Sequence, residues 1–164
     1  MRLPRALTTL RPQRDNRRMA NDDDQPIDPL ALYLHLARAS ELRRQPLVRD
    51  RLLVIAAAEA AAASLPRIAA FCRDKVLSHN HGHMLRRWET VEEATGEDDF
   101  LLHLKQLRRR FPPEKAEQML HSLNIDSAGQ RAAYYNDEEY AASIFGLTLA
   151  ELEQMFPGGE EPAE

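Results

Sequence analysis

Prolines occur at intervals along the chain, and their surroundings indicate where helices begin. Asp28-Pro29, Pro46, Pro66 and Pro112-Pro113 each precede a stretch rich in helix-forming residues. Proline is favoured in the first turn of a helix, where its missing N–H costs nothing, and it breaks a helix elsewhere. Helices beginning at these prolines are therefore expected over residues 29–44, 46–64, 66–80 and 113–123.

Capping patterns and apolar spacing predict further, shorter helices. Thr90 with Glu93 and Thr148 with Glu151 have the spacing of capping boxes. No segment alternates between apolar and polar residues as a half-buried strand does. We expect an all-α fold, an irregular multi-helix bundle of about seven or eight helices, longer in the N-terminal half and short and capped in the C-terminal half. Other candidate helix caps are Asp98 or Asp99, Asp126 and Asp137, and Gly82 is the expected stop of the helix over residues 66–80.

The chain length is suited to one hydrophobic core. The 164 residues are 43% hydrophobic, which is ordinary for a globular domain of this size. We expect a single helical domain over residues 28–157, a disordered lead-in over 1–27 and an acidic flexible tail over 158–164. No apolar run approaches the roughly 20 residues of a membrane span, and a single cysteine excludes an intramolecular disulfide. A cytoplasmic protein without a membrane partner is expected.

The lead-in has two parts of opposite charge. Residues 1–18 contain six arginines and one acid, whereas residues 19–27 are acidic. The first part is either a basic arm, an organellar transit peptide, or upstream sequence if translation starts at Met19. Without it the net charge changes from −4 to −9. Such an acidic body repels nucleic acid unless its charges are segregated.

Histidines gather where the helix over residues 66–80 is expected to end. His79, His81 and His83 follow Cys72 in the sequence, and imidazole and thiolate groups are zinc ligands. Histidines at a helix C-terminus also simply complement its negative dipole, and no CxxC or HExxH spacing accompanies these four residues. Zinc binding by Cys72, His79, His81 and His83 is therefore an alternative hypothesis.

The sequence contains no recognisable catalytic motif. GxSxG, the Walker loop and GxGxxG are all absent. Cys72 lies among apolar residues of an expected helix, which favours an inert buried thiol over a nucleophile. We therefore expect a protein that is not an enzyme and has no catalytic residues.

Residues 137–156 indicate two short helices joined at Gly146-Leu147-Thr148. Ala142 precedes the glycine by four positions, and apolar residues flank both. This arrangement resembles a helix-turn-helix, which implies DNA binding by the second helix. That helix, however, carries Glu151 and Glu153 and neither Lys nor Arg, so it would meet phosphates with the wrong charge. We interpret the segment as a structural corner and keep DNA binding as an alternative.

Basic residues form two groups in the sequence, one around residues 38–51 and one around residues 105–115, with Arg86-Arg87-Trp88 between them. If they converge, they form a positive face for an anionic partner, and Trp88 offers a stacking ring. If they do not, the arginines stay solvated at helix ends and Trp88 anchors the core. The partner-binding candidates are Arg86, Arg87, Trp88, Arg108, Arg109 and Arg110.

The absence of catalytic motifs, together with segregated charge, favours a non-enzymatic helical interaction or adaptor domain with a protein partner. One alternative is a nucleic-acid-binding regulator that uses the arginine groups or the helix-turn-helix-like corner. The other alternative is a metal-binding helical protein with zinc as its cofactor.

Overall fold

The computed structural model describes residues 28–157, and the regular elements in this range are all helical. They are α2 (Pro29–Leu42), α3 (Pro46–Ala62), α4 (Pro66–His79), the 3-10 helix η1 (Met84–Arg87), α5 (Val91–Ala94), α6 (Asp98–Arg110), α7 (Pro113–Ser122), α8 (Ser127–Arg131), α9 (Asp137–Ile144) and α10 (Leu149–Met155). The expected all-α class with longer N-terminal helices is confirmed, with nine α-helices in this range against about seven or eight expected. The expected lead-in over 1–27 and tail over 158–164 lie outside the described residues.

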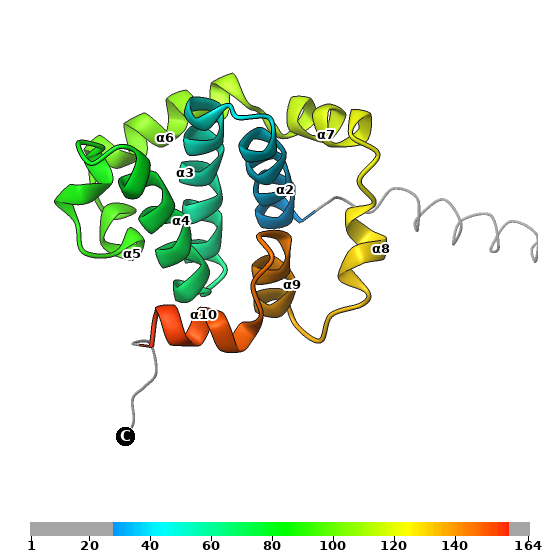
Figure 1. Cartoon of the computed structure of the whole chain (residues 1–164). Coiled ribbons are helices and arrows are strands. Elements are labelled where there is room, and N and C mark those ends of the chain that lie inside the picture. The colour runs from blue at the N-terminus through cyan, green and yellow to red at the C-terminus, as the bar shows by residue number, and fades with distance from the viewer. Residues whose placement is uncertain (1–27, 158–164) are drawn as a thin grey trace, which may run out of the picture.

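Helices α2, α3 and α4 stand side by side in the middle of the molecule, and the shorter helices surround them (Figure 1). Every residue of α3 from Leu52 to Ala58 is buried. A helix is buried on all sides only when other elements cover it completely, so α3 is the central element of the core. Its alanines allow the neighbouring backbones to approach closely.

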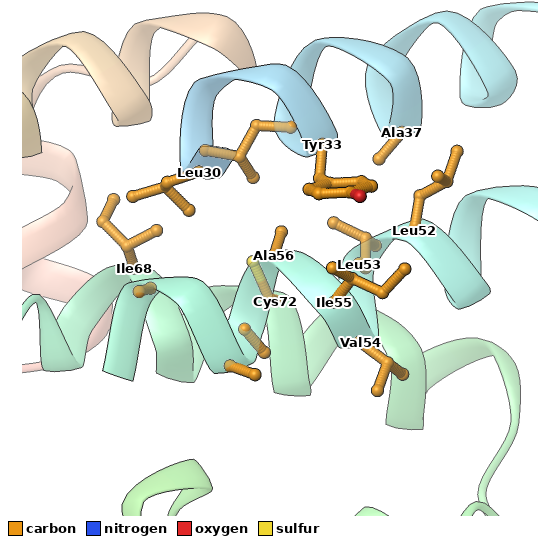
Figure 2. Packing of buried hydrophobic residues seen from close by; sticks show 14 of the residues in the cluster. Leu30, Tyr33, Ala37, Leu52, Leu53, Val54, Ile55, Ala56, Ile68 and Cys72 are labelled. Carbon is orange, nitrogen blue, oxygen red and sulfur yellow. The ribbon is translucent and has the colours of Figure 1, made fainter. Parts of the chain in front are cut away.

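Side chains from α2, α3 and α4 interlock in this core (Figure 2). Tyr33 of α2 faces Leu53 of α3, and Cys72 of α4 lies beside Ala56 of α3. The Tyr33 hydroxyl donates a 2.7 Å hydrogen bond to the carbonyl of Phe111, the residue that follows α6. This contact fixes the end of α6 against the central helices.

The four proline-marked helix starts are confirmed. Helices α2, α3, α4 and α7 each begin at the proline expected. All four expected ends are one or two residues too late. The two-residue differences fall at Arg44 and Ser64, which adopt left-handed backbone angles with φ of 60° and 61°. Glycine normally takes this position after a helix, so nothing in these side chains indicated the earlier ends. Gly82 is wrong as the stop of α4, which ends at His79.

The expected caps are confirmed in part. Thr148 and Glu151 form a complete capping box at the start of α10. The Asp126 side chain accepts the N–H of Gly129 and caps α8. Asp98 and Asp137 are instead the first helical residues, so they stabilise the helix dipole without capping.

None of the described helices is long and apolar enough to cross a membrane.

Candidate functional site

The structure divides the six partner-binding candidates between the two ends of α6. Arg87 lies beside the first turn of this helix, where its Nη1 is 3.1 Å from Oδ2 of Asp99. Arg108, Arg109 and Arg110 form the last turn. Because an α-helix rises about 1.5 Å per residue, the two groups are about 15 Å apart along the helix axis. They do not form one continuous basic patch.

Trp88 anchors η1 and α6 to the rest of the molecule. Its ring meets that of Phe100 edge to face, with centroids 6.0 Å apart. Its backbone carbonyl accepts a 2.7 Å hydrogen bond from Nη2 of Arg73. The guanidinium of Arg87 lies over the ring, 5.7 Å from its centroid. The ring is therefore engaged with neighbouring residues of the chain, as expected of a core anchor.

A surface groove lies at the C-terminal end of α6. Its volume is about 430 Å³, and it is lined by Leu101, Leu104, Lys105, Arg108, Arg109 and Pro112. The floor is apolar, whereas the rim carries three basic side chains. Arg108 is partly engaged, because its Nη2 lies 2.7 Å from Oε2 of Glu59 on α3. Lys105 and Arg109 form no ion pair with a described carboxylate and extend into solvent.

Leu101, which lines this groove, and its neighbour Leu102 are exposed although α6 is amphipathic. Phe100, Leu104 and Leu107 of α6 face the core, but Leu101 and Leu102 are 43% and 59% exposed. Leu101, Lys105 and Arg108 are spaced as residues of one helix face. We call Leu101, Leu102, Lys105, Arg108 and Arg109 the α6 surface. It presents apolar and basic groups side by side.

Some residues of the other basic group, near residues 38–51, form ion pairs within the molecule. The carboxylate of Glu41 on α2 accepts hydrogen bonds from Arg38 at 2.7 Å, Arg49 at 3.1 Å and Lys75 at 2.7 Å. Partial burial alone would raise the pKa of Glu41, but the hydrogen bonds and charges of Lys75 and Arg49 outweigh it and lower the pKa. Lys75 and Arg49 come from α4 and α3, so this ion-pair network joins the three central helices.

The turn between α2 and α3 exposes a second set of apolar and basic side chains. Leu42 and Leu47 are 69% and 64% exposed, and Arg43 and Arg44 lie between them on the surface. The turn therefore matches the α6 surface in residue types. It provides a natural control for experiments on that surface.

The four metal-ligand candidates are not brought together. Cys72 is fully buried, and burial raises the pKa of its thiol to about 12. The Nδ1 of His79 is 2.5 Å from Oδ2 of Asp50, and the Nδ1 of His83 accepts the N–H of Leu85 at 3.1 Å. His81 is exposed. No three or more His, Cys, Asp or Glu residues between 28 and 157 are placed to hold a metal ion.

A buried polar cluster that the sequence analysis did not identify joins α2 to the C-terminal helices. The Nε2 of His35 is 2.6 Å from the hydroxyl of Tyr140, which is 3.2 Å from the hydroxyl of Ser127. Burial lowers the pKa of His35 and raises that of Tyr140. The cluster is uncharged and closed to solvent, so we assign it a structural role. His35 and Tyr140 are 105 residues apart in sequence, and no local pattern relates them.

The helix-turn-helix-like segment forms the corner expected from the sequence. Gly146 lies between α9 and α10 with φ of 77°, a left-handed conformation that favours glycine. Leu152 is the buried residue of α10, and Glu151 and Glu153 point to solvent. The solvent-facing side of α10 is thus acidic, which is unfavourable for contact with phosphates.

Compared with protein-family models, with curated proteins and with solved structures, the chain matches none of them.

Proposed function

We propose that the protein is a non-enzymatic interaction module that binds an acidic, amphipathic segment of a protein partner on the α6 surface. The observation that carries the proposal is the pair of exposed leucines beside a groove with an apolar floor and a basic rim. Amphipathic helices bind such grooves through apolar anchors. Complementary charge around the anchors sets the orientation and increases the association rate.

The leucines supply the apolar part of this argument. Leu101 and Leu102 expose about half of their surface, because Phe100, Leu104 and Leu107 occupy the core side of α6. Burial of a leucine side chain stabilises a complex by about 1–2 kcal/mol. A partner with apolar residues at helical spacing would cover both leucines and Leu104 at the floor of the groove.

The charges favour a protein partner over a nucleic acid. Lys105 and Arg109 have no carboxylate partner among the described residues, so an acidic segment would give them one. The whole chain carries a net charge of −4, which repels a long polyanion more than a short acidic segment. A phosphate backbone would also leave the two leucines without apolar contacts.

The test compares two double variants of the full chain that carry the same substitutions on different surfaces. The first is Leu102→Asp with Arg109→Glu, on the α6 surface. The matched control is Leu42→Asp with Arg43→Glu, on the turn between α2 and α3. Each variant and the unmodified protein are co-purified from the native cells at low and moderate salt, and the bound proteins and nucleic acids are identified.

The expected result is a stoichiometric protein partner that binds the unmodified protein and the control but is lost from the α6 variant. Its contact segment is expected to be acidic and amphipathic. A partner retained by the α6 variant, or lost equally from the control, would show that the α6 surface is not the site. Recovery of RNA or DNA that disappears at moderate salt would replace the proposal with nucleic-acid binding.

A further inference from the structure

A second cavity lies away from the α6 surface, where α4, the start of α5 and the end of α10 meet. Its volume is about 430 Å³, within the range of small-molecule sites. Ala70 of α4, Val91 of α5 and Phe156 after α10 supply apolar lining. Both α5 and α10 pack against α4 (Figure 1), so the cavity lies between elements that hold one another in place.

Arg73 lines this cavity with a hydrogen-bonding group that is not satisfied. Its Nη2 donates to the carbonyl of Trp88 at 2.7 Å, but its Nε is buried without an acceptor. Among the described residues it also has no carboxylate partner. The Nη1 of Arg73 also has no partner among the described residues but is not buried, so it is the nitrogen that a ligand can reach. A guanidinium with an unpaired charge is suited to a carboxylate.

The other arginine of the cavity is already engaged. The Nε of Arg67 donates to the carbonyl of Phe156 at 3.3 Å, and its Nη1 lies 3.6 Å from Oε2 of Glu138. These contacts hold the end of α10 against α4. Arg67 therefore shapes the cavity, and Arg73 is the group with hydrogen-bonding capacity left for a ligand.

The acidic lining residues restrict which anions fit. Asp74, Glu89 and Glu92 also line the cavity, but all three are exposed, so water and salt screen them. Arg73, in contrast, is partly buried, and an ionic hydrogen bond is stronger away from water. A ligand with several negative charges would approach the three carboxylates, whereas a single carboxylate can reach Arg73 and leave an uncharged body in the cavity.

We propose that this cavity binds a small monocarboxylate with an apolar body. The carboxylate accepts hydrogen bonds from Arg73, and the apolar body packs against Ala70, Val91 and Phe156. The proposal is independent of the α6 surface, because the two sites share no lining residue.

Octanoate is the probe for this proposal, with octanol and octylamine as controls of the same chain length. Trp88 is the single tryptophan and its carbonyl is bonded to Arg73, so its fluorescence and its indole NMR signal report on the site. Octanoate is expected to shift these signals saturably below about 1 mM, and the alcohol and amine are not. The α6 double variant is expected to bind octanoate as the unmodified protein does.

Two variants separate the role of Arg73 from general effects of charge. Arg73→Gln is expected to weaken octanoate binding by about 10-fold to 100-fold, the range of a hydrogen bond to a charged group. Arg86→Gln removes an exposed arginine outside the cavity and is expected to leave binding unchanged. Thermal unfolding of each variant checks that it is folded.

Three results would overturn the proposal. The first is the absence of a saturable shift in the unmodified protein up to about 5 mM octanoate, which needs no variant to interpret. The second is equal binding of octanol or octylamine. The third is undiminished octanoate binding by folded Arg73→Gln protein, which would place the carboxylate elsewhere.

Discussion

The central helices and the C-terminal helices begin in different ways. Helices α2, α3 and α4 each start at a proline, and no side chain caps their first N–H groups. Helices α8, α9 and α10 are each capped by a side chain, from Asp126, Asn136 and Thr148 respectively. The first three have 14 to 17 residues and the last three only 5 to 8.

This difference shows what stabilises helices of different length. A long helix with many buried side chains gains most of its stability from packing. The uncapped N–H groups at its start therefore reduce its stability only slightly. Helix α8 buries only Ser127 and α10 only Leu152, so their capping hydrogen bonds contribute a large share of their stability. The N-terminal half is expected to be sensitive to core substitutions and the C-terminal half to cap substitutions.

The largest effect is expected from Leu53→Ala in α3. Leu53 is completely buried, and its truncation is expected to lower the free energy of unfolding by about 2–5 kcal/mol through lost burial and a residual cavity. Urea denaturation measures this loss. Leu152→Ala in α10 is expected to cost less, because α10 packs mainly against α4 and α9, whereas α3 packs against α2, α4, α5 and α6. Equal losses would contradict the distinction between the two regions.

Acidification is expected to destabilise the protein through three histidines. Burial lowers the pKa of His35 and of His103, and burial followed by the charge of His103 lowers that of His83. As the pH falls below about 6.5 the unfolded chain takes up protons before the folded one, so the free energy of unfolding decreases. It stops decreasing below the lowered pKa values.

Urea midpoints measured between pH 7.5 and pH 5, at about half-unit steps, test this expectation. His35→Gln removes the titrating group at the junction of α2 and α9 and is expected to make the pH dependence shallower, whatever its effect on stability at neutral pH. Stability that is constant or rises on acidification would show that these histidines are not held neutral by burial.

The caps provide the sharpest comparison between the two regions. Thr148→Ala removes a side chain that accepts the N–H of Glu151 and is expected to cost about 1 kcal/mol, within a range of about 0.5–2. Gln45→Ala changes the corresponding position of α3, where the side chain makes no capping bond, and is expected to cost less than about 0.5 kcal/mol. Equal losses in urea denaturation would contradict the proposed role of the caps.

A small effect that depends on salt is expected from Arg131→Gln. The Nε of Arg131 lies 2.9 Å from Oδ1 of Asp137, but both side chains are exposed, at 37% and 69%. Exposed ion pairs contribute about 0–1 kcal/mol. The loss in free energy of unfolding is expected to stay below about 1 kcal/mol and to decrease at high salt. A larger, salt-independent loss would indicate that this pair is structurally important.

Local chemistry explains which parts of the fold could be predicted. The helix starts at Pro29, Pro46, Pro66 and Pro113 are visible because proline has a fixed φ and no N–H. The capping box at Thr148 can be predicted from the sequence because Thr148 and Glu151 are only three residues apart. The left-handed ends at Arg44 and Ser64 were missed, because they depend on how the following helix packs and not on the residue itself.

The candidate surface was predicted only in part. The basic end of α6 was identified from its charge, but the separation of Arg87 from Arg109 and the exposure of Leu102 required the structure. Nothing in the sequence indicated that Arg73 would lie in a cavity with a buried, unsatisfied N–H. Such a property depends on three helices that meet at one place.

The sequence by itself determined the all-α class, the helix starts and most of the caps, because each of these follows from sterics and hydrogen bonds within a few residues. Only the tertiary structure decided which charged groups are paired inside the molecule and which face solvent. Glu41 meets Lys75 from a position 34 residues away, and His35 meets Tyr140 across 105 residues. Contacts at these separations depend on helix packing, which also decided that Leu101 and Leu102 are exposed.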